Sequence, residues 1–296
     1  MASASPSLSV STLATTVASG GVDQRDDIPT IRFTNIEDLF KAVGQAQGDF
    51  LIFQDVPLSD FEELCLREKR PFRIRRYHAS EGILIVTIPT DLHESLHLGL
   101  HRIYDHKLVR SGQERGWKAI GSTTFRPRGH PGGDGGEGDS SGGPKPTRHA
   151  LGAWPTLVIE AGDSESLSAL QDDMRWWFSA SDHDVKIVLL AKFDHENQRI
   201  IIEKWEEALQ IRPGATTTRR AATGPILQPV LRQHITITRD IPTDSYHVTR
   251  GALVLSFRLL FLRDPSPQEG DYVISIAELQ DYARDVWVYV RDQIGW

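Results

Sequence analysis

Residues 154–167 read Trp-Pro-Thr-Leu-Val-Ile-Glu-Ala-Gly-Asp-Ser-Glu-Ser-Leu, and they decide the class of fold. The short apolar run before Glu160 contains β-branched residues and predicts a buried strand that ends at this carboxylate. An amphipathic pattern predicts a helix over residues 165–179, and the apolar run at residues 185–191 predicts a second buried strand. A strand, a helix and a strand in this order favour an α/β sheet with helices on its faces.

The flanking segments extend this pattern on both sides. Residues 83–88 predict a strand that Pro89 ends, and apolar residues at helical spacing predict an amphipathic helix over residues 91–110. Residues 117–125 predict a strand, and residues 200–205 predict another that pairs with the strand before it. The expected fold class is therefore α/β, with a mixed β-sheet flanked by helices.

Composition divides the chain into zones. We expect residues 1–30 to be a disordered tail, because the first part of this segment is uncharged and rich in Ser, Ala and Thr. Residues 31–210 form the expected core, interrupted by a glycine-rich loop over residues 126–149, where glycine and proline make up half of the sequence. Residues 211–229 are typical of a linker, and residues 230–296 of a β-rich extension with a terminal helix.

The extension contains a clear helix start. Residues 234–238 and 272–276 predict strands. Ser275 and Glu278 have the spacing of a capping box, which predicts a final helix from this point. We find no chemistry-bearing motif in this part of the chain. The apolar stripe of the final helix is Leu279, Ala283, Val286 and Val290.

Charge and cysteine content limit the function classes. The 296 residues include 33 Lys and Arg and 40 Asp and Glu, a net charge of −7, so no bulk positive field attracts nucleic acid or an anionic membrane. The single cysteine, Cys65, excludes an internal disulfide and a cysteine-based zinc site, and it fits a reducing compartment. No apolar run approaches the ~20 residues that span a bilayer. We expect an intracellular protein, cytoplasmic or nuclear, with no membrane partner.

Three histidines recur along the helix expected over residues 91–110. His93, His97 and His101 stand at i, i+4 and i+8, which places the three imidazoles on roughly one helix face. Metal ligation is one interpretation of this spacing. We favour the other interpretation, a polar helix face, and assign no H-E-x-x-H motif to it.

A second group, Asp139, Glu160 and Lys186, offers acid and base chemistry. A strand that ends in a carboxylate projects this group from the sheet edge, and the carboxylate of Asp139 converges with that of Glu160 if Asp139 lies on the neighbouring strand. Two hard oxygen ligands suit Mg²⁺ or Mn²⁺. A lysine one strand away can orient the attacking water and stabilise the transition state of a phosphoryl reaction.

The order of four segments is similar to a pattern found in a known superfamily. The segments are residues 137–141, 154–166, 170–177 and 185–188. Together they resemble a fungal branch of the PD-(D/E)XK nuclease superfamily, similar to bacterial restriction-endonuclease-like proteins, over about residues 70–205. The resemblance implies a restriction-endonuclease-like fold, with a four-stranded mixed core sheet flanked by two helices, and Mg²⁺-dependent phosphodiester hydrolysis. It also implies that Asp139 and Glu160 are the metal-binding acids.

Three positions depart from the superfamily pattern. Gly138 stands where proline is usual, and Gly162 stands where the motif lysine follows the second acid. Residues 140–146 are poor strand formers, so the strand that carries Asp139 looks eroded. Lys186 and Arg175 are the candidate substitutes for the lysine, and Lys186 is favoured because arginine cannot act as a base at neutral pH.

Each of the three candidate catalytic residues also has a purely structural interpretation. Glu160 can bond backbone N–H groups of the turn that follows its strand. Asp139 lies among Gly, Ser and Asp residues, where acids are common turn formers. Lys186 can protect an edge strand against aggregation.

A basic stretch offers a candidate DNA contact. Residues 67–76 hold six basic residues and one acid, and residues 72–75 alternate as in a strand with a basic face. Such a face binds phosphates by counterion release, and the alternative is an ordinary exposed strand face. The candidates for nucleic-acid contact are Arg70, Arg73, Arg75 and Arg76.

Three functional hypotheses follow. The first is a metal-dependent phosphodiesterase, DNA endonuclease-like, in which Asp139 and Glu160 bind Mg²⁺ or Mn²⁺ and Lys186 stabilises the attacking water. The second is a catalytically silent protein of the same fold that binds nucleic acid or protein; the missing lysine and the eroded strand favour it. The third is an interaction protein built on the apolar C-terminal strands. A homodimer formed through an edge strand or the extension is compatible with each.

Overall fold

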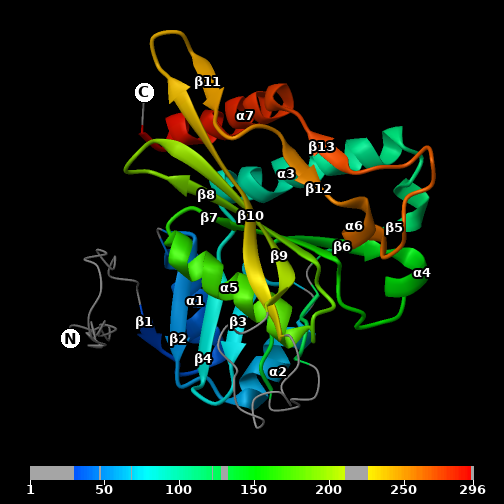
Figure 1. Ribbon diagram of the computed structural model, residues 1–296. Coiled ribbons are helices and arrows are strands. Elements are labelled where there is room, and N and C mark those ends of the chain that lie inside the picture. Colours follow the sequence, from blue (N-terminus) through cyan, green and yellow to red (C-terminus); the bar gives the residue numbers. More distant parts are fainter. Residues whose placement is uncertain are drawn as a thin grey trace, which may run out of the picture. The chain divides into compact units, whose positions relative to one another are not determined.

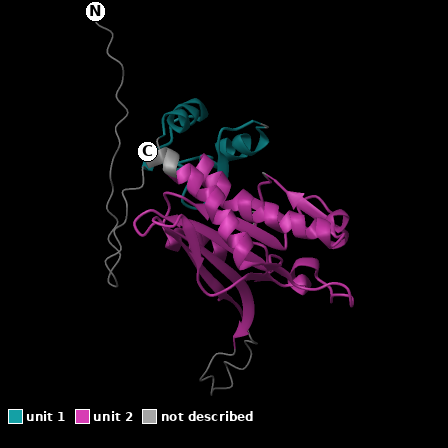
Figure 2. Ribbon diagram, turned by 90° about the horizontal axis from the view of Figure 1, so that it is seen from above, with its two compact units in different colours: residues 1–89, 130–137 teal, residues 90–129, 138–296 magenta. Residues whose placement is uncertain are grey.

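A computed structural model of the chain describes residues 30–46, 48–67, 69–121, 123–127, 133–210 and 226–294 (Figure 1). It divides the chain into two compact units, residues 1–89 with 130–137 and residues 90–129 with 138–296 (Figure 2). These boundaries differ from the expected single core over residues 31–210. The tail expected over residues 1–30, except Thr30, and most of the linker expected over residues 211–229 lie outside the described residues.

Unit 1 is built on a four-stranded sheet in the order β1-β2-β4-β3. Strands β1 and β2 are parallel, and the other two pairings are antiparallel. The core beneath the sheet includes Phe61, which stacks on Tyr77 with the ring centroids 4.0 Å apart. The elements are β1 (Thr30–Arg32), α1 (Ile36–Gln45), β2 (Phe50–Gln54), α2 (Leu58–Leu66), β3 (Arg73–His78) and β4 (Ile83–Thr87).

Unit 2 is built on a seven-stranded mixed sheet in the order β11-β10-β9-β8-β7-β6-β5, beside a two-stranded sheet of β12 and β13. Only β7 and β8 are parallel, joined by a crossover through α5. The elements are α3 (Asp91–Arg110), the 3₁₀ helix η1 (Glu114–Gly116), β5 (Trp117–Ile120), β6 (Ser140–Pro144), α4 (Lys145–Arg148), β7 (Leu157–Gly162), α5 (Leu167–Ala180), β8 (Ile187–Asp194), β9 (Arg199–Gln210), β10 (Ile226–Asp240), β11 (Ser245–Val248), β12 (Leu253–Leu255), α6 (Phe257–Phe261), β13 (Tyr272–Ile274) and α7 (Ile276–Ile294).

The expected class of fold is confirmed at the level of a mixed α/β architecture, but the C-terminal extension is organised differently from the expectation. Its first strand, β10, pairs antiparallel with β9 along most of its length and therefore adds to the same sheet. Helix α7 contributes Leu279, Ala283 and Val286 to the core that also contains β7 and β8. Residues 226–294 are thus an integral part of unit 2.

Helices cover both faces of the unit 2 sheet, and the alternation along β7 shows which residue faces which helix (Figure 1). Leu157 and Ile159 belong to the core that contains the apolar residues of α3 and α7. Val158, between them, belongs to a second core with Met174 and Trp177 of α5. Because successive side chains of a strand point to opposite faces, Glu160 points to the α5 face.

The helices of unit 2 begin close to the predicted positions. Helix α3 spans the predicted residues 91–110, with Thr90 as N-cap. Helix α5 begins at Leu167, with Ser166 as its N-cap. The predicted capping box of α7 is confirmed, since Ser275 and Glu278 bond each other's main-chain N–H groups. None of the helices in the described ranges has the length and apolar character needed to cross a bilayer.

Strand β6 forms inside the segment that the sequence predicts as a glycine-rich loop. It lies between β5 and β7, with Gly142 opposite Ala119 on one side and Leu157 on the other. A Cβ atom at Gly142 would stand 2.5 Å from the indole nitrogen of Trp117, so a side chain does not fit there. Glycine weakens a strand by itself, but here it is required for close packing against Trp117. The tertiary contacts made in this way offset the weak strand propensity.

Removal of the α7 cap by Ser275→Ala is expected to lower the free energy of unfolding by about 1 kcal/mol. Burial raises the pKa of Glu278, but hydrogen bonds from Lys107 and Ser275 outweigh burial, so this pKa lies below its ordinary value of 4.5. The cap therefore stabilises the fold fully above this value and loses its contribution as the pH falls through the lowered pKa. Urea unfolding at pH 7 and at low pH measures the effect, with Ser179→Ala as the exposed control, for which less than about 0.5 kcal/mol is expected. An equal loss in both variants at pH 7 would contradict this assignment.

Candidate functional site

Of the two predicted acids, Asp139 lies just before β6 and Glu160 lies in β7, which pairs antiparallel with β6. Ser140 and Ser141 of β6 stand opposite Ile159 and Val158 of β7, so Asp139 adjoins the end of this pairing. The Asp139 carboxylate accepts the main-chain N–H of Ala161 at 2.8 Å, which fixes it where the β6–β7 ladder ends.

Glu160 lies inside β7, two residues before its end, and not at the predicted strand-to-helix junction. Its side chain is 2% exposed, and its Oε1 accepts a hydrogen bond from the indole N–H of Trp177 on α5. The N-terminus of α5 is capped instead by Ser166, whose hydroxyl accepts the N–H of Ala169 at 3.2 Å.

The structure does not bring Lys186 to the two acids. Lys186 precedes β8, and its ammonium donates to the main-chain carbonyl of His183 at 2.5 Å. The β8 residue beside Glu160 is Leu190. Leu190 comes four positions after Lys186, which corresponds to about 13 Å at the usual rise of a strand. Arg175, the other substitute considered, pairs with Asp172 and is exposed on α5.

Sequence reasoning did not single out Lys192, which lies near the end of β8. In the parallel pairing of β7 and β8 it stands beside Gly162, the position where the resemblance predicts the motif lysine. Partnered residues of adjacent strands point to the same face, so Lys192 shares the α5 face with Glu160. Its ammonium donates to the main-chain carbonyls of Asp163, at 2.8 Å, and Phe193. Counting along β8 from the partner of Glu160 would have found it.

An Asp–His pair lies at the same end of β7 and β8. The Nε2 atom of His195 is 2.5 Å from the Asp163 carboxylate. The side chain of Asp163 is mostly buried, while that of His195 is about half exposed. The carboxyl ends of these two strands therefore hold an ammonium and an acid–imidazole pair.

The expected basic strand face is not found in unit 1. A β-bulge interrupts the β3–β4 register between Ile74 and Arg76, so the predicted alternation breaks at Arg75. Arg75 and Arg76 are both buried, and Arg70 pairs at 2.7 Å with the buried carboxylate of Glu137. Arg73 is the remaining candidate and is half-buried. Because buried guanidinium groups cannot reach a phosphate backbone, this strand does not form the predicted DNA-binding face.

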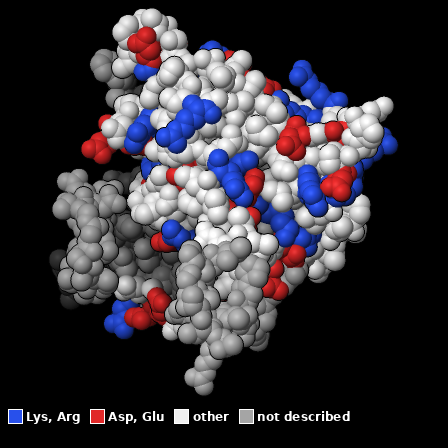
Figure 3. Space-filling view, in the orientation of Figure 1, with Lys and Arg blue, Asp and Glu red and all other residues white. Residues whose placement is uncertain are grey.

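Charge on the visible surface follows no single sign. On the face drawn in Figure 3, Lys and Arg side chains are interspersed with Asp and Glu side chains among the described residues. This distribution agrees with the net charge of −7 and gives no extended positive track on that face.

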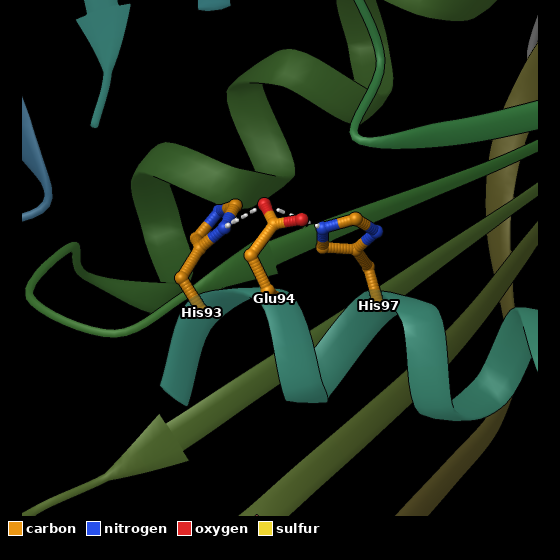
Figure 4. Close-up of side chains that lie close together, drawn as sticks. All are labelled: His93, Glu94 and His97. Carbon is orange, nitrogen blue, oxygen red and sulfur yellow. Dashed lines mark hydrogen bonds and ion pairs between the residues drawn. The ribbon is translucent and has the colours of Figure 1, made fainter. Parts of the chain in front are cut away.

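Two histidines and a glutamate gather on the first turns of α3 (Figure 4). The Oε1 atom of Glu94 is 3.1 Å from Nε2 of His97 and 3.6 Å from Nδ1 of His93. Residues 93–97 read His-Glu-Ser-Leu-His, which is the H-E-x-x-H spacing, so the sequence interpretation that assigned no such motif was wrong. His101 lies outside the group and pairs with Asp105 at 3.1 Å.

Asp139 connects this histidine group to the sheet. Its Oδ2 atom is 3.3 Å from Nε2 of His93, and Nδ1 of His97 is 2.8 Å from the hydroxyl of Ser140. Consecutive residues at the start of β6 therefore contact the two rings.

Compared with known proteins, the sequence matches no family model and no curated protein.

Proposed function

We propose that the chain is a metal-dependent phosphodiesterase of the PD-(D/E)XK kind, DNA endonuclease-like. One observation carries the proposal: Asp139 bonds the main-chain N–H of Ala161 in β7, the strand of Glu160, and Lys192 of β8 stands beside Gly162. Two acids and a lysine are the side chains that the superfamily resemblance implies, and here Asp139 lies just before β6, Glu160 in β7 and Lys192 in β8. In this proposal the lysine is supplied by β8 instead of β7, which accounts for the glycine at position 162 where the superfamily pattern has a lysine.

The scaffold around these residues supports the proposal. Strands β5 to β8 form a mixed four-stranded group within the larger sheet, with β7 and β8 parallel and the others antiparallel. Helix α3 packs on one face of this group and α5 on the other. A four-stranded mixed sheet flanked by two helices is the core that the resemblance implies.

The donor set fits Mg²⁺ or Mn²⁺. Asp139 and Glu160 would hold the ion, since carboxylate oxygens are the ligands that Mg²⁺ prefers; Asp139 contacts His93 of α3, and Glu160 contacts Trp177 of α5. A bound ion of this kind neutralises charge on a phosphate and activates a water molecule. Lys192 would add a fixed positive charge on the same sheet face, where it stabilises negative charge that develops on the phosphoryl oxygens.

Cleavage assays on the full chain test the proposal. Purified protein is incubated with supercoiled plasmid and with single-stranded and double-stranded oligonucleotides, at low salt, over a titration of Mg²⁺ and of Mn²⁺. We expect cleavage that depends on the added metal and stops with excess chelator. Equal cleavage in the presence of chelator would contradict a metal-dependent phosphodiesterase.

Lys192→Met is expected to lower the rate of metal-dependent cleavage by at least about 100-fold, the range found when a group that stabilises transition-state charge is removed. Lys186→Met is the matched control, because it removes the same group just before the start of β8, where the ammonium donates to the main-chain carbonyl of His183. We expect this control to keep the rate. A loss confined to Lys186→Met would restore Lys186 as the catalytic lysine and contradict the register argument.

A catalytically silent binding module is the second candidate. The observation that favours it is the near-complete burial of Glu160, whose carboxylate is bonded to Trp177. A silent module predicts no metal-dependent cleavage and no metal-dependent thermal shift from Mg²⁺, together with DNA binding that weakens steeply with salt or binding of a protein partner.

A further inference from the structure

We propose that α3 holds a divalent transition-metal ion of the zinc class through His93 Nδ1, Glu94 Oε1 and His97 Nε2. One ligand atom from each residue lies within 4.8 Å of the other two. Zinc bonds to nitrogen and oxygen are about 2.0–2.2 Å long, so two ligands of one ion are at most about 4.4 Å apart. The separations of 3.1 Å and 3.6 Å from Glu94 to the two rings lie within this limit (Figure 4).

The local structure brings the three side chains together without a distant loop. The i, i+4 spacing of His93 and His97 places both rings on one face of α3, and Glu94 is the next residue on the same turn. Both histidines are buried, at 1% and 0% exposure, which holds their rings in place. The side chain of Glu94 is 27% exposed, and it gives the site contact with solvent.

Outer contacts orient the two rings. Metal-bound histidines typically donate their second ring nitrogen to an oxygen acceptor, which fixes the tautomer. Here His93 directs Nε2 toward the Asp139 carboxylate at 3.3 Å, and His97 directs Nδ1 toward the Ser140 hydroxyl at 2.8 Å. Protons on these outer nitrogens would leave the inner nitrogens as ligands for a cation beside the Glu94 carboxylate.

The donor set selects the class of ion. Two imidazoles and one carboxylate form the set found at open catalytic zinc sites, whereas Mg²⁺ prefers oxygen ligands alone. The site is therefore distinct from the carboxylate pair proposed to hold Mg²⁺, although Asp139 contributes to both. It requires neither Glu160 nor DNA, and it goes beyond the proposed function.

Zinc titration of the full chain tests the site. Protein is stripped with a chelator, dialysed, and titrated with Zn²⁺ by isothermal titration calorimetry, with thermal unfolding followed in parallel. We expect one Zn²⁺ per chain, affinity that is micromolar or tighter, and a rise in Tm on binding. His97→Ala and His93→Ala are each expected to weaken this binding by at least about 100-fold, and Ser140→Ala by about 10–100-fold.

His101→Ala is the matched control, since it removes an imidazole one turn farther along α3 and should keep the wild-type affinity. Ser140→Ala removes only a hydroxyl, so its effect decides the matter if the histidine variants do not fold. The proposal is overturned if Zn²⁺ does not bind one-to-one, or if both His93→Ala and His97→Ala keep the wild-type affinity. If the histidine variants do not fold, a wild-type affinity in Ser140→Ala overturns it. Glu160→Gln should retain Zn²⁺ binding, so failure of the nuclease proposal and failure of this site are separate results.

Discussion

Glu160→Gln is expected to reduce the rate of Mg²⁺-dependent cleavage by at least about 1,000-fold. This is the largest effect on activity that we expect, and it lies at the upper end of the range for loss of one charge-stabilising group. The substitution keeps the size of the side chain and an oxygen that can accept the Trp177 indole N–H. It removes the negative charge, and an amide oxygen is a poor substitute for a carboxylate as a Mg²⁺ ligand. Initial cleavage rates over a full Mg²⁺ titration measure the change.

Glu203→Gln provides a closely matched control for this prediction. Glu203 of β9 is paired with Leu190 of β8, which is in turn paired with Glu160. Like Glu160, Glu203 is buried and accepts a hydrogen bond from a tryptophan indole, that of Trp205. Because Glu203 is two strands away from Glu160, its substitution should keep the metal-dependent rate. Equal losses in both variants would show that the effect comes from a buried carboxylate in general, and the assignment of Glu160 would fail.

Gly142→Ala is expected to destabilise unit 2 by about 1–3 kcal/mol, the usual cost of overpacking a well-filled site. The new Cβ would stand 2.5 Å from the indole nitrogen of Trp117 and 2.8 Å from the adjacent ring carbon. Trp117 is itself buried and packs edge-to-face against Tyr104, so it cannot move without disturbing that contact. Urea unfolding monitored by tryptophan fluorescence measures the loss.

Gly121→Ala supplies the comparison, because it lies just after β5 and no atom stands within 4 Å of its Cβ position. A change smaller than about 0.5 kcal/mol is expected there. If Gly142→Ala were as stable as Gly121→Ala, the close approach of β6 to Trp117 would not be a constraint on the strand, and the physical account of the glycine-rich strand would be wrong.

Periodicity and capping predicted much of the framework. The stripe of leucines set α3 correctly, and the reciprocal Ser275–Glu278 pattern located the start of α7, because both signals are local in the sequence. Strand β6 was missed because its reason is non-local: Gly142 and its neighbours fit beneath Trp117, more than twenty residues earlier. The bulge at Arg75 was missed for the same reason, since the extra residue is defined only by the partner strand β4.

The candidate site was predictable in part. The sequence suggested that Asp139 could lie on the strand beside Glu160; the structure places Asp139 just before β6, where it bonds the main-chain N–H of Ala161 in β7. Lys192 was not singled out, because motif matching searches a fixed spacing along the chain. Lys192 is adjacent to Gly162 only through strand pairing. The His93–Glu94–His97 group had a complete local signal and could have been found from the residue order alone.

Neither unit is a single continuous stretch of chain. Unit 1 needs residues 133–137, which follow α3 and β5, and the bond from the main-chain N–H of Ile74 to Glu137 closes 63 residues of sequence. A fragment that begins at Thr90 would leave Gly135 without its bridge to Tyr77, and one that ends at Pro89 would lose Glu137 as the partner of Arg70. On the ribosome, unit 1 is completed only after the first helix of unit 2 has been made, so synthesis of the two units is interleaved.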